Sequence, residues 1–232
     1  MKNAIKLYTT FIPTKILKWI VYLVYPLSLM IMSATFGRNY LFYGYIIMPL
    51  IFWVELMLNN LMFKEITTKA PVRIEYMHTS DKGVRLLFDV LKVDVIRRFV
   101  TVCAIGMMPV IYTKLFHPDS IAPNPYVVYG ETISETLSSL YYLLATLLLA
   151  IIIEIDLWIA RNAKSGIAIF FLIGFMGYMA CVVLGIMLGV MVSWLGEKWY
   201  FVAVVISIVV YALVVTFSYK NIMKSEERKF FD

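Results

Sequence analysis

The sequence contains few charged residues. Only 16% of its 232 residues are charged and 62% are hydrophobic, whereas about a quarter of a typical soluble domain is charged. The apolar residues form long uninterrupted runs, and no charge occurs between Lys164 and Glu197. This shortage excludes an ordinary soluble domain and predicts a single-domain, all-α integral membrane protein over residues 1–232.

Cysteine and histidine are also scarce. The two cysteines, Cys103 and Cys181, lie in apolar runs, so a disulfide framework is not expected. The two histidines, His78 and His117, are predicted on opposite sides of a membrane, which leaves no histidine metal site. The sequence has no zinc-protease motif, no nucleophile elbow and no phosphate-binding loop. We therefore expect no catalytic residue, bound metal or cofactor on this chain.

The uncharged runs predict six transmembrane helices, at about 17–37, 42–63, 99–113, 136–153, 166–187 and 199–219. The first contains Pro26, which predicts a kink. The third is short, and it can span only if Arg97 and Arg98 extend towards the membrane surface. Residues 188–198 are expected to form a re-entrant or interfacial piece.

The basic residues are unevenly distributed between the predicted loops. The N-terminus, the interval 64–98, the connection 154–165 and the C-terminal tail together carry 18 of the 21 Lys and Arg residues. The positive-inside rule then predicts a multi-pass protein of the cell membrane with both termini in the cytoplasm. The net charge of +6 is explained in this way without a nucleic-acid partner.

The interval 64–98 has the pattern of an amphipathic helix. Thr79 or Ser80 can cap its N-terminus, and Gly83 is a plausible break from a shorter helix upstream. Apolar residues then follow at helical spacing: Val84, Leu87, Phe88, Leu91, Val95 and Phe99. Such a helix lies at the membrane surface or against a soluble partner. A plain linker helix at the surface is the alternative.

Acidic residues are rare within the predicted spans. Glu55 is the one acid well inside a span, and burial in lipid would be expensive, so it is expected to face the bundle interior near Asn59. A structural hydrogen-bonded carboxylate and a position on a translocation path both remain open. Glu154 and Asp156 are expected to mark the cytoplasmic end of the fourth span, with the basic residues that follow, rather than to bind a metal.

Small residues recur every four positions in the fifth span, at Gly177, Cys181, Gly185 and Gly189. This spacing places them on one helix face and permits close helix packing. The partner could be another helix of the chain or a second protomer.

This plan is similar to that of the membrane subunits of ABC-2 type exporters. Those proteins have an amphipathic N-terminal segment, six spans and a large cytoplasmic interval between the second and third spans. Their coupling helix often has a Ser-x-x-Gly then Leu-Leu context, matched here by Ser80, Gly83, Leu86 and Leu87. The proline that often follows is absent, and Phe88, Asp89 and Val90 stand there instead.

The resemblance implies a permease subunit that exports an amphipathic peptide, drug or lipid-like substrate, similar to the permeases of bacteriocins and lantibiotics. Its partners would be ABC ATPase subunits that bind ATP and Mg, a second permease protomer, identical or related, and membrane lipid. The residues expected to couple to the ATPase are Ser80, Gly83, Arg85, Leu87, Phe88, Asp89 and Lys92. Two other classes are a non-transporting membrane protein, such as an immunity or assembly factor, and a membrane-embedded enzyme, which the lack of grouped catalytic residues disfavours.

Overall fold

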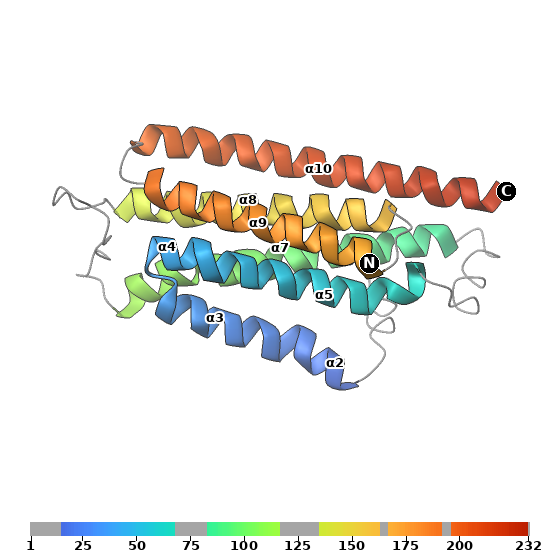
Figure 1. The fold of residues 1–232 in the computed structure, drawn as a ribbon, viewed down its shortest axis with the longest axis horizontal. Helices are drawn as coiled ribbons and strands as arrows, with labels where there is room; N and C mark the ends of the chain where they lie inside the picture. Colours follow the sequence, from blue (N-terminus) through green and yellow to red (C-terminus); the bar gives the residue numbers. More distant parts are fainter. Residues whose placement is uncertain (1–14, 68–82, 117–134, 163–166, 192–195, 232) are drawn as a thin grey trace.

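The computed structural model describes residues 15–67, 83–116, 135–162, 167–191 and 196–231, and the elements within these ranges are all helices. The first segment joins α2 (Lys15–Trp19), the π-helix η1 (Ile20–Val24) and α3 (Tyr25–Phe36). The second joins α4 (Tyr40–Phe42), the π-helix η2 (Tyr43–Ile47) and α5 (Met48–Thr67). The remaining helices are α7 (Gly83–Phe116), α8 (Glu135–Asn162), α9 (Ile167–Met191) and α10 (Glu197–Phe231). Figure 1 shows these segments side by side along one axis, with successive segments running in opposite directions.

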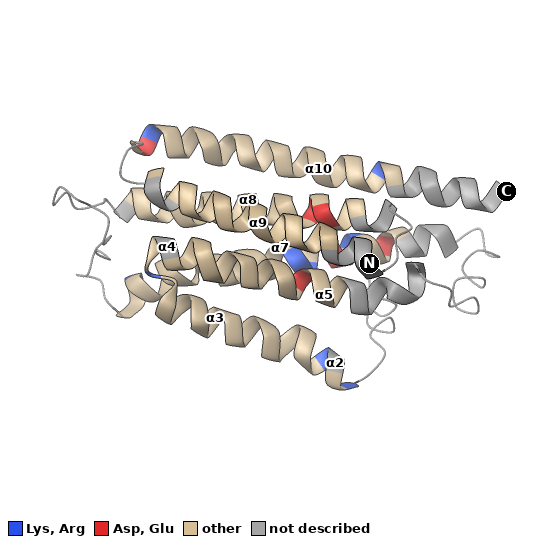
Figure 2. Cartoon of the chain, in the orientation of Figure 1, with Lys and Arg blue, Asp and Glu red and all other residues tan. Residues whose placement is uncertain are grey.

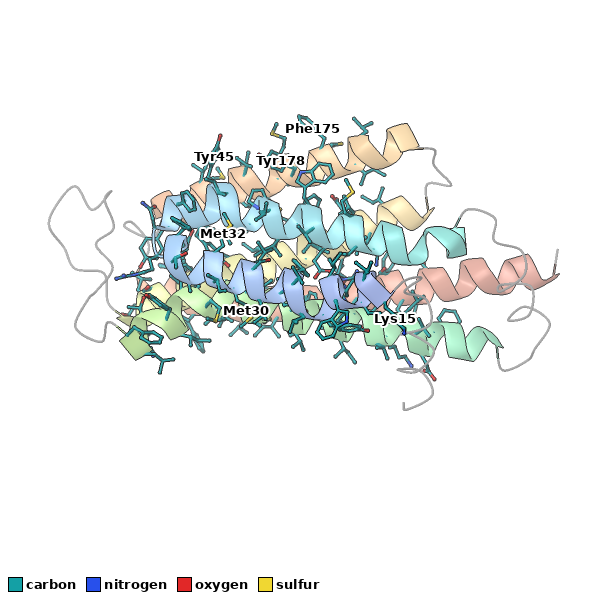
Figure 3. All side chains as sticks on the ribbon, turned by 90° about the horizontal axis from the view of Figure 1, so that it is seen from below. Lys15, Met30, Met32, Tyr45, Phe175 and Tyr178 are labelled. Carbon is teal, nitrogen blue, oxygen red and sulfur yellow. The ribbon has the colours of Figure 1, made fainter. Side chains whose placement is uncertain are left out.

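The centre of the bundle is α8, which packs against α5, α7, α9 and α10. One face of α8 carries an apolar residue every four positions, and each of these residues is buried: Tyr141, Ala145, Leu149, Ile153 and Leu157. Residues four apart lie on the same side of a helix, so this ladder forms a continuous core stripe. By contrast, the outer segments expose large apolar side chains, such as Tyr45 on η2 and Phe175 on α9, both at the outer surface in Figure 3.

Within the described residues, three helices are long and apolar enough to cross a membrane: Phe88–Phe116, Thr136–Ile159 and Glu197–Asn221. They correspond to the predicted third, fourth and sixth spans. The other three predicted spans correspond to shorter apolar helices, Ile20–Phe36, Tyr43–Asn59 and Leu172–Leu188. The all-helical class is therefore confirmed, while three candidate spans are found where the sequence predicts six.

The predicted amphipathic helix and the predicted third span form one helix. α7 runs from Gly83 to Phe116 without interruption, and Pro109 lies inside it. Gly83 stands at its first residue, and no glycine or proline follows until Gly106, so nothing in the sequence breaks the helix between the polar and apolar parts. At 1.5 Å per residue the helix is about 50 Å long, and it contains both the polar and the apolar part.

A proline follows each π-helix after one intervening residue. The N–H of Tyr25 bonds to the carbonyl of Ile20, five residues back, and Pro26 follows. Likewise the N–H of Met48 bonds to the carbonyl of Tyr43, and Pro49 follows. A proline lacks the N–H for an ordinary helical bond and crowds the carbonyl four residues earlier, so the turn before it widens. The expected disturbance at Pro26 thus takes the form of a π turn.

A group of tyrosines ties α8 to the chain reversal between α3 and α4. The ring of Tyr40 lies 4.6 Å from that of Tyr141, and Tyr43 lies 5.0 Å from Tyr142 in an edge-to-face arrangement. The Tyr141 hydroxyl donates to the carbonyl of Tyr40 at 2.9 Å, and the Tyr142 hydroxyl donates to that of Gly37 at 2.8 Å. These bonds satisfy polar groups buried in an apolar interior.

The widened turn η2 lies directly against α9. A Cβ on Gly185 would lie 2.6 Å from the carbonyl carbon of Gly44, and a Cβ on Gly44 would meet the backbone of Gly185 in return. The two backbones touch because neither residue has a side chain.

Gly185→Ala should therefore lower stability. The added methyl group has only backbone in front of it, which cannot rotate away, and overpacking of this kind costs about 1–3 kcal/mol. Thermal unfolding of the purified protein in detergent measures the effect. Gly196→Ala is the matched control, because a Cβ there meets nothing within 4 Å. Equal melting temperatures for the two variants would contradict the close contact.

Candidate functional site

Seven polar side chains gather inside the bundle and form what we call the ion cluster: Tyr25, Glu55, Asn59, Asp94, Arg97, Arg98 and Glu154. They come from α3, α5, α7 and α8. Figure 2 shows charge at this level on several helices, whereas long stretches of the same helices towards the other end carry none. The cluster lies nearer the end at which α2 begins and α10 finishes (Figures 1 and 2).

Arg97 joins α7 to α5. Its guanidinium donates to both carboxylate oxygens of Glu55, at 2.8 Å and 3.3 Å, and lies 3.4 Å from Asp94 Oδ1. Glu55 is fully buried, and its Oε1 also accepts a hydrogen bond of 2.9 Å from the Tyr25 hydroxyl on α3. A forked guanidinium–carboxylate pair is among the strongest and most directional polar contacts. Three segments are therefore joined at Glu55.

Arg98 joins α7 to α8. Its Nε donates to Glu154 Oε1 at 2.8 Å, and its Nη1 lies 3.1 Å from Asp94 Oδ2. The same Oδ2 accepts a hydrogen bond of 3.0 Å from the Asn59 amide on α5. Asp94 thus contacts both arginines and α5.

The spacing along α7 produces this arrangement. Asp94, Arg97 and Arg98 stand at positions i, i+3 and i+4, so their side chains share one face of the helix. The neighbouring Phe99 stacks on Tyr211 of α10, with ring centroids 4.8 Å apart. The aromatic contact and the ion pairs together fix the rotation of α7 about its axis.

Among the described residues, the ion cluster brings three carboxylates together with two guanidinium groups. Burying ions is expensive, and the expense is offset only by close pairing and hydrogen bonds. Among the described residues no group of three His, Cys, Asp or Glu side chains could hold a metal ion. The arrangement joins α3, α5, α7 and α8 through buried polar contacts.

The sequence prediction for the two arginines is wrong. They were expected to extend towards the membrane surface, but Arg98 is 2% exposed and Arg97 is largely buried. Paired acids on α5 and α8 make burial possible, and a single-helix view cannot include them. Asp94, one helix turn before the two arginines, contacts both of them.

Glu154 and Asp156 do not end α8, which continues to Asn162. Both side chains are buried, and Glu154 pairs with Arg98. Glu55 and Asn59 lie in the interior, where they bond to α7 residues.

The predicted ATPase-coupling residues fall at the start of α7. Phe88 is buried with its ring 5.4 Å from that of Tyr219 on α10. Lys92 Nζ lies 5.4 Å from the centre of the same ring and 3.7 Å from Asp89 Oδ1. We call these four residues the α7–α10 joint. Ser80 and the side chains of Arg85 and Leu87 lie outside the described residues, and Gly83 begins α7.

The predicted small-residue face of α9 points into the chain. Gly177 faces Asp156 and Phe52, and Gly185 faces Gly44. Cys181 is fully buried between them along the helix, and the surroundings of Gly189 lie outside the described residues.

Sequence reasoning missed the ion cluster as a unit. Tyr25 gave no signal, because a tyrosine in a span is unremarkable. The other members could have been found from their chemistry: a buried acid such as Glu55 needs a cationic partner, and Arg97 and Arg98 border an apolar run that is too short to span without them.

Comparisons of this chain with protein-family models, with curated proteins and with solved structures gave no match.

Arg98→Met should destabilise the protein strongly. It leaves Glu154 and part of the Asp94 charge buried without a cation, and breaking a buried pair in this way costs about 3–5 kcal/mol. Lys92→Met on the same helix is the control, because Lys92 and Asp89 are both about half exposed and such a pair contributes about 1 kcal/mol or less. Thermal unfolding in detergent compares the two variants. Similar losses would mean that Arg98 reaches water in solution.

Proposed function

We propose that this chain is the membrane-spanning permease subunit of an ATP-driven exporter of the ABC-2 type. It would move an amphipathic peptide, drug or lipid-like substrate out of the cell together with a separate ATPase. The observation that carries the proposal is the continuity of α7, which joins the α7–α10 joint to the ion cluster in one helix.

A push on the joint would be transmitted along α7. Lys92 and Arg98 are six residues apart, a rise of about 9 Å along a helix. Beyond them, Arg97 contacts α5 and Arg98 contacts α8. An ATPase that displaces the start of α7 would therefore move three helices as a unit, the kind of rigid coupling that alternating conformations require.

The proposal includes six crossings with both termini in the cytoplasm. In support, the alternating directions of the segments place the start of α2, the start of α7 and the end of α10 at one end of the bundle (Figure 1). Lys15, Lys18, Lys92 and Lys220 belong to that end, while Arg38, Lys114 and Lys198 belong to the other. Each of the three shorter apolar segments would cross the membrane together with the residues that flank it.

Cysteine labelling tests this topology. With Cys103 and Cys181 replaced by alanine, cysteines at Lys18 and Lys220 should react with a membrane-impermeant reagent only in inside-out vesicles. Cysteines at Lys114 and Lys198 should react only in intact cells. Reaction of Lys18 and Lys114 variants from the same side would rule out the six-pass arrangement.

Purification from native membranes tests the transport function. The tagged chain should carry with it ATPase activity from a second chain that has a phosphate-binding loop, and the pair should export a substrate when reconstituted. Reversing charge at the joint with Asp89→Lys and Lys92→Glu together keeps the internal pair but alters the surface offered to a partner, so it should weaken association or uncouple ATP hydrolysis from export. Lys114→Glu at the other end is the matched control and should leave both unchanged. A purified chain without ATPase would instead favour the immunity or assembly class.

A further inference from the structure

Asp156 lies on the side of α8 opposite to the ion cluster. It is two residues from Glu154, which places the two carboxylates on different faces of the helix. Glu154 bonds to Arg98, whereas Asp156 faces α9. Only 7% of Asp156 is exposed, and its Oδ2 has no hydrogen-bond partner among the described residues.

The space for this carboxyl group comes from a missing side chain. A Cβ on Gly177 of α9 would overlap Asp156 Oδ2, and it would also meet the ring of Phe52 on α5. Any other residue at position 177 would therefore occupy the place of the carboxyl group. Phe52 is itself fully buried, so the side chain beside this position is apolar.

No cation on a neighbouring helix neutralises Asp156 within the described residues. α9 contains no Asp, Glu, Lys or Arg between Ile167 and Met191. The buried thiol of Cys181 is the titratable group of α9 that interacts with Asp156. A thiol can donate only a weak hydrogen bond and supplies no positive charge.

Described ionisable side chains on the other helices around α8 make contacts elsewhere. Glu55 of α5 is bonded to Arg97, and Arg98 of α7 is bonded to Glu154. On α10, Tyr211 interacts with Glu154 and Arg98 rather than with Asp156.

We propose that Asp156 is a proton-binding site, which holds a proton while α8 and α9 are packed together and releases it when water enters the contact between them. An ionised carboxylate in this setting would be a buried charge without a counter-ion, whereas a carboxylic acid is neutral. The carboxylate and a water-borne proton are the only reactants. The inference concerns the α8–α9 contact and does not depend on the proposed export function.

Proton binding at Asp156 would be thermodynamically linked to the packing of α9 on α8. If packing of α9 on α8 favours the protonated form, then protonation favours packing by the same free energy. The packed protein binds more protons than the opened one over the pH range in which Asp156 is ionised in the opened protein but still protonated in the packed one. The stability of the packed protein therefore falls as the pH rises through this range.

Infrared spectroscopy of the purified protein at neutral pH tests the proposal directly. The wild type should show a carboxylic-acid C=O band that shifts when the aspartate carboxyl carbons are labelled with ¹³C. The band should be absent from Asp156→Asn and unchanged in Asp89→Asn, which alters a half-exposed aspartate. The labelled wild type gives the answer even if a variant fails to fold. Absence of an aspartic-acid band, or a band that persists in Asp156→Asn, overturns the proposal.

Thermal unfolding across pH gives a second measurement. The melting temperature of the wild type should fall as the pH is raised, and Asp156→Asn should lack the part of this fall that comes from residue 156, because an amide does not ionise. Parallel curves for the wild type and Asp156→Asn would show that no proton is bound there.

Discussion

Two adjacent arginines inside an apolar bundle impose the strongest constraint on this fold. Neither Arg97 nor Arg98 can be buried alone, so each must meet a carboxylate on another helix. Glu55 and Glu154 supply these carboxylates from α5 and α8, and Asp94 contacts both arginines. Because the guanidinium groups lie on one face of α7, satisfying them fixes the rotation of α7 and its height against its neighbours.

Elsewhere in the bundle, close backbone contact fixes the position of one segment against another. Gly44 and Gly185 let η2 and α9 touch, and the π turn that includes Gly44 is widened by the proline that follows it. At the same end, Tyr141 and Tyr142 donate hydrogen bonds to the chain reversal between α3 and α4. The helix α8 is thus held by ion pairs near one end and by tyrosines near the other.

The bundle contains helix contacts of two kinds. The ion cluster and the α7–α10 joint lie on one unbroken helix, which is ion-paired to α5 and α8. The α8–α9 contact differs, because Asp156 places there a buried carboxyl group that makes no ion pair or hydrogen bond among the described residues. A proton bound at Asp156, as we propose, would let this contact be weakened without breaking any ion pair.

The sequence by itself determined the all-helical class and the approximate position of the helices. Long runs without charge can be stable as helices only where apolar side chains are buried or face lipid, and this requirement is local to each run. The same local reasoning predicted that Glu55 needs the interior. It could not decide which helices would meet, so it misjudged Arg97 and Arg98 as surface-seeking and took Glu154 and Asp156 for a helix end.

Only the tertiary structure decided these points, because the partners of a buried charge lie far away in the sequence. Arg98 and Glu154 are separated by 56 positions, and Arg97 and Glu55 by 42. The helical periodicity of a single sequence relates residues one or two turns apart, so it carries no information about such distant pairs. The different environments of Glu154 and Asp156 have the same origin: their spacing assigns them to two faces, but the packing of α7 and α9 on α8 decides that one carboxylate meets an arginine and the other a glycine.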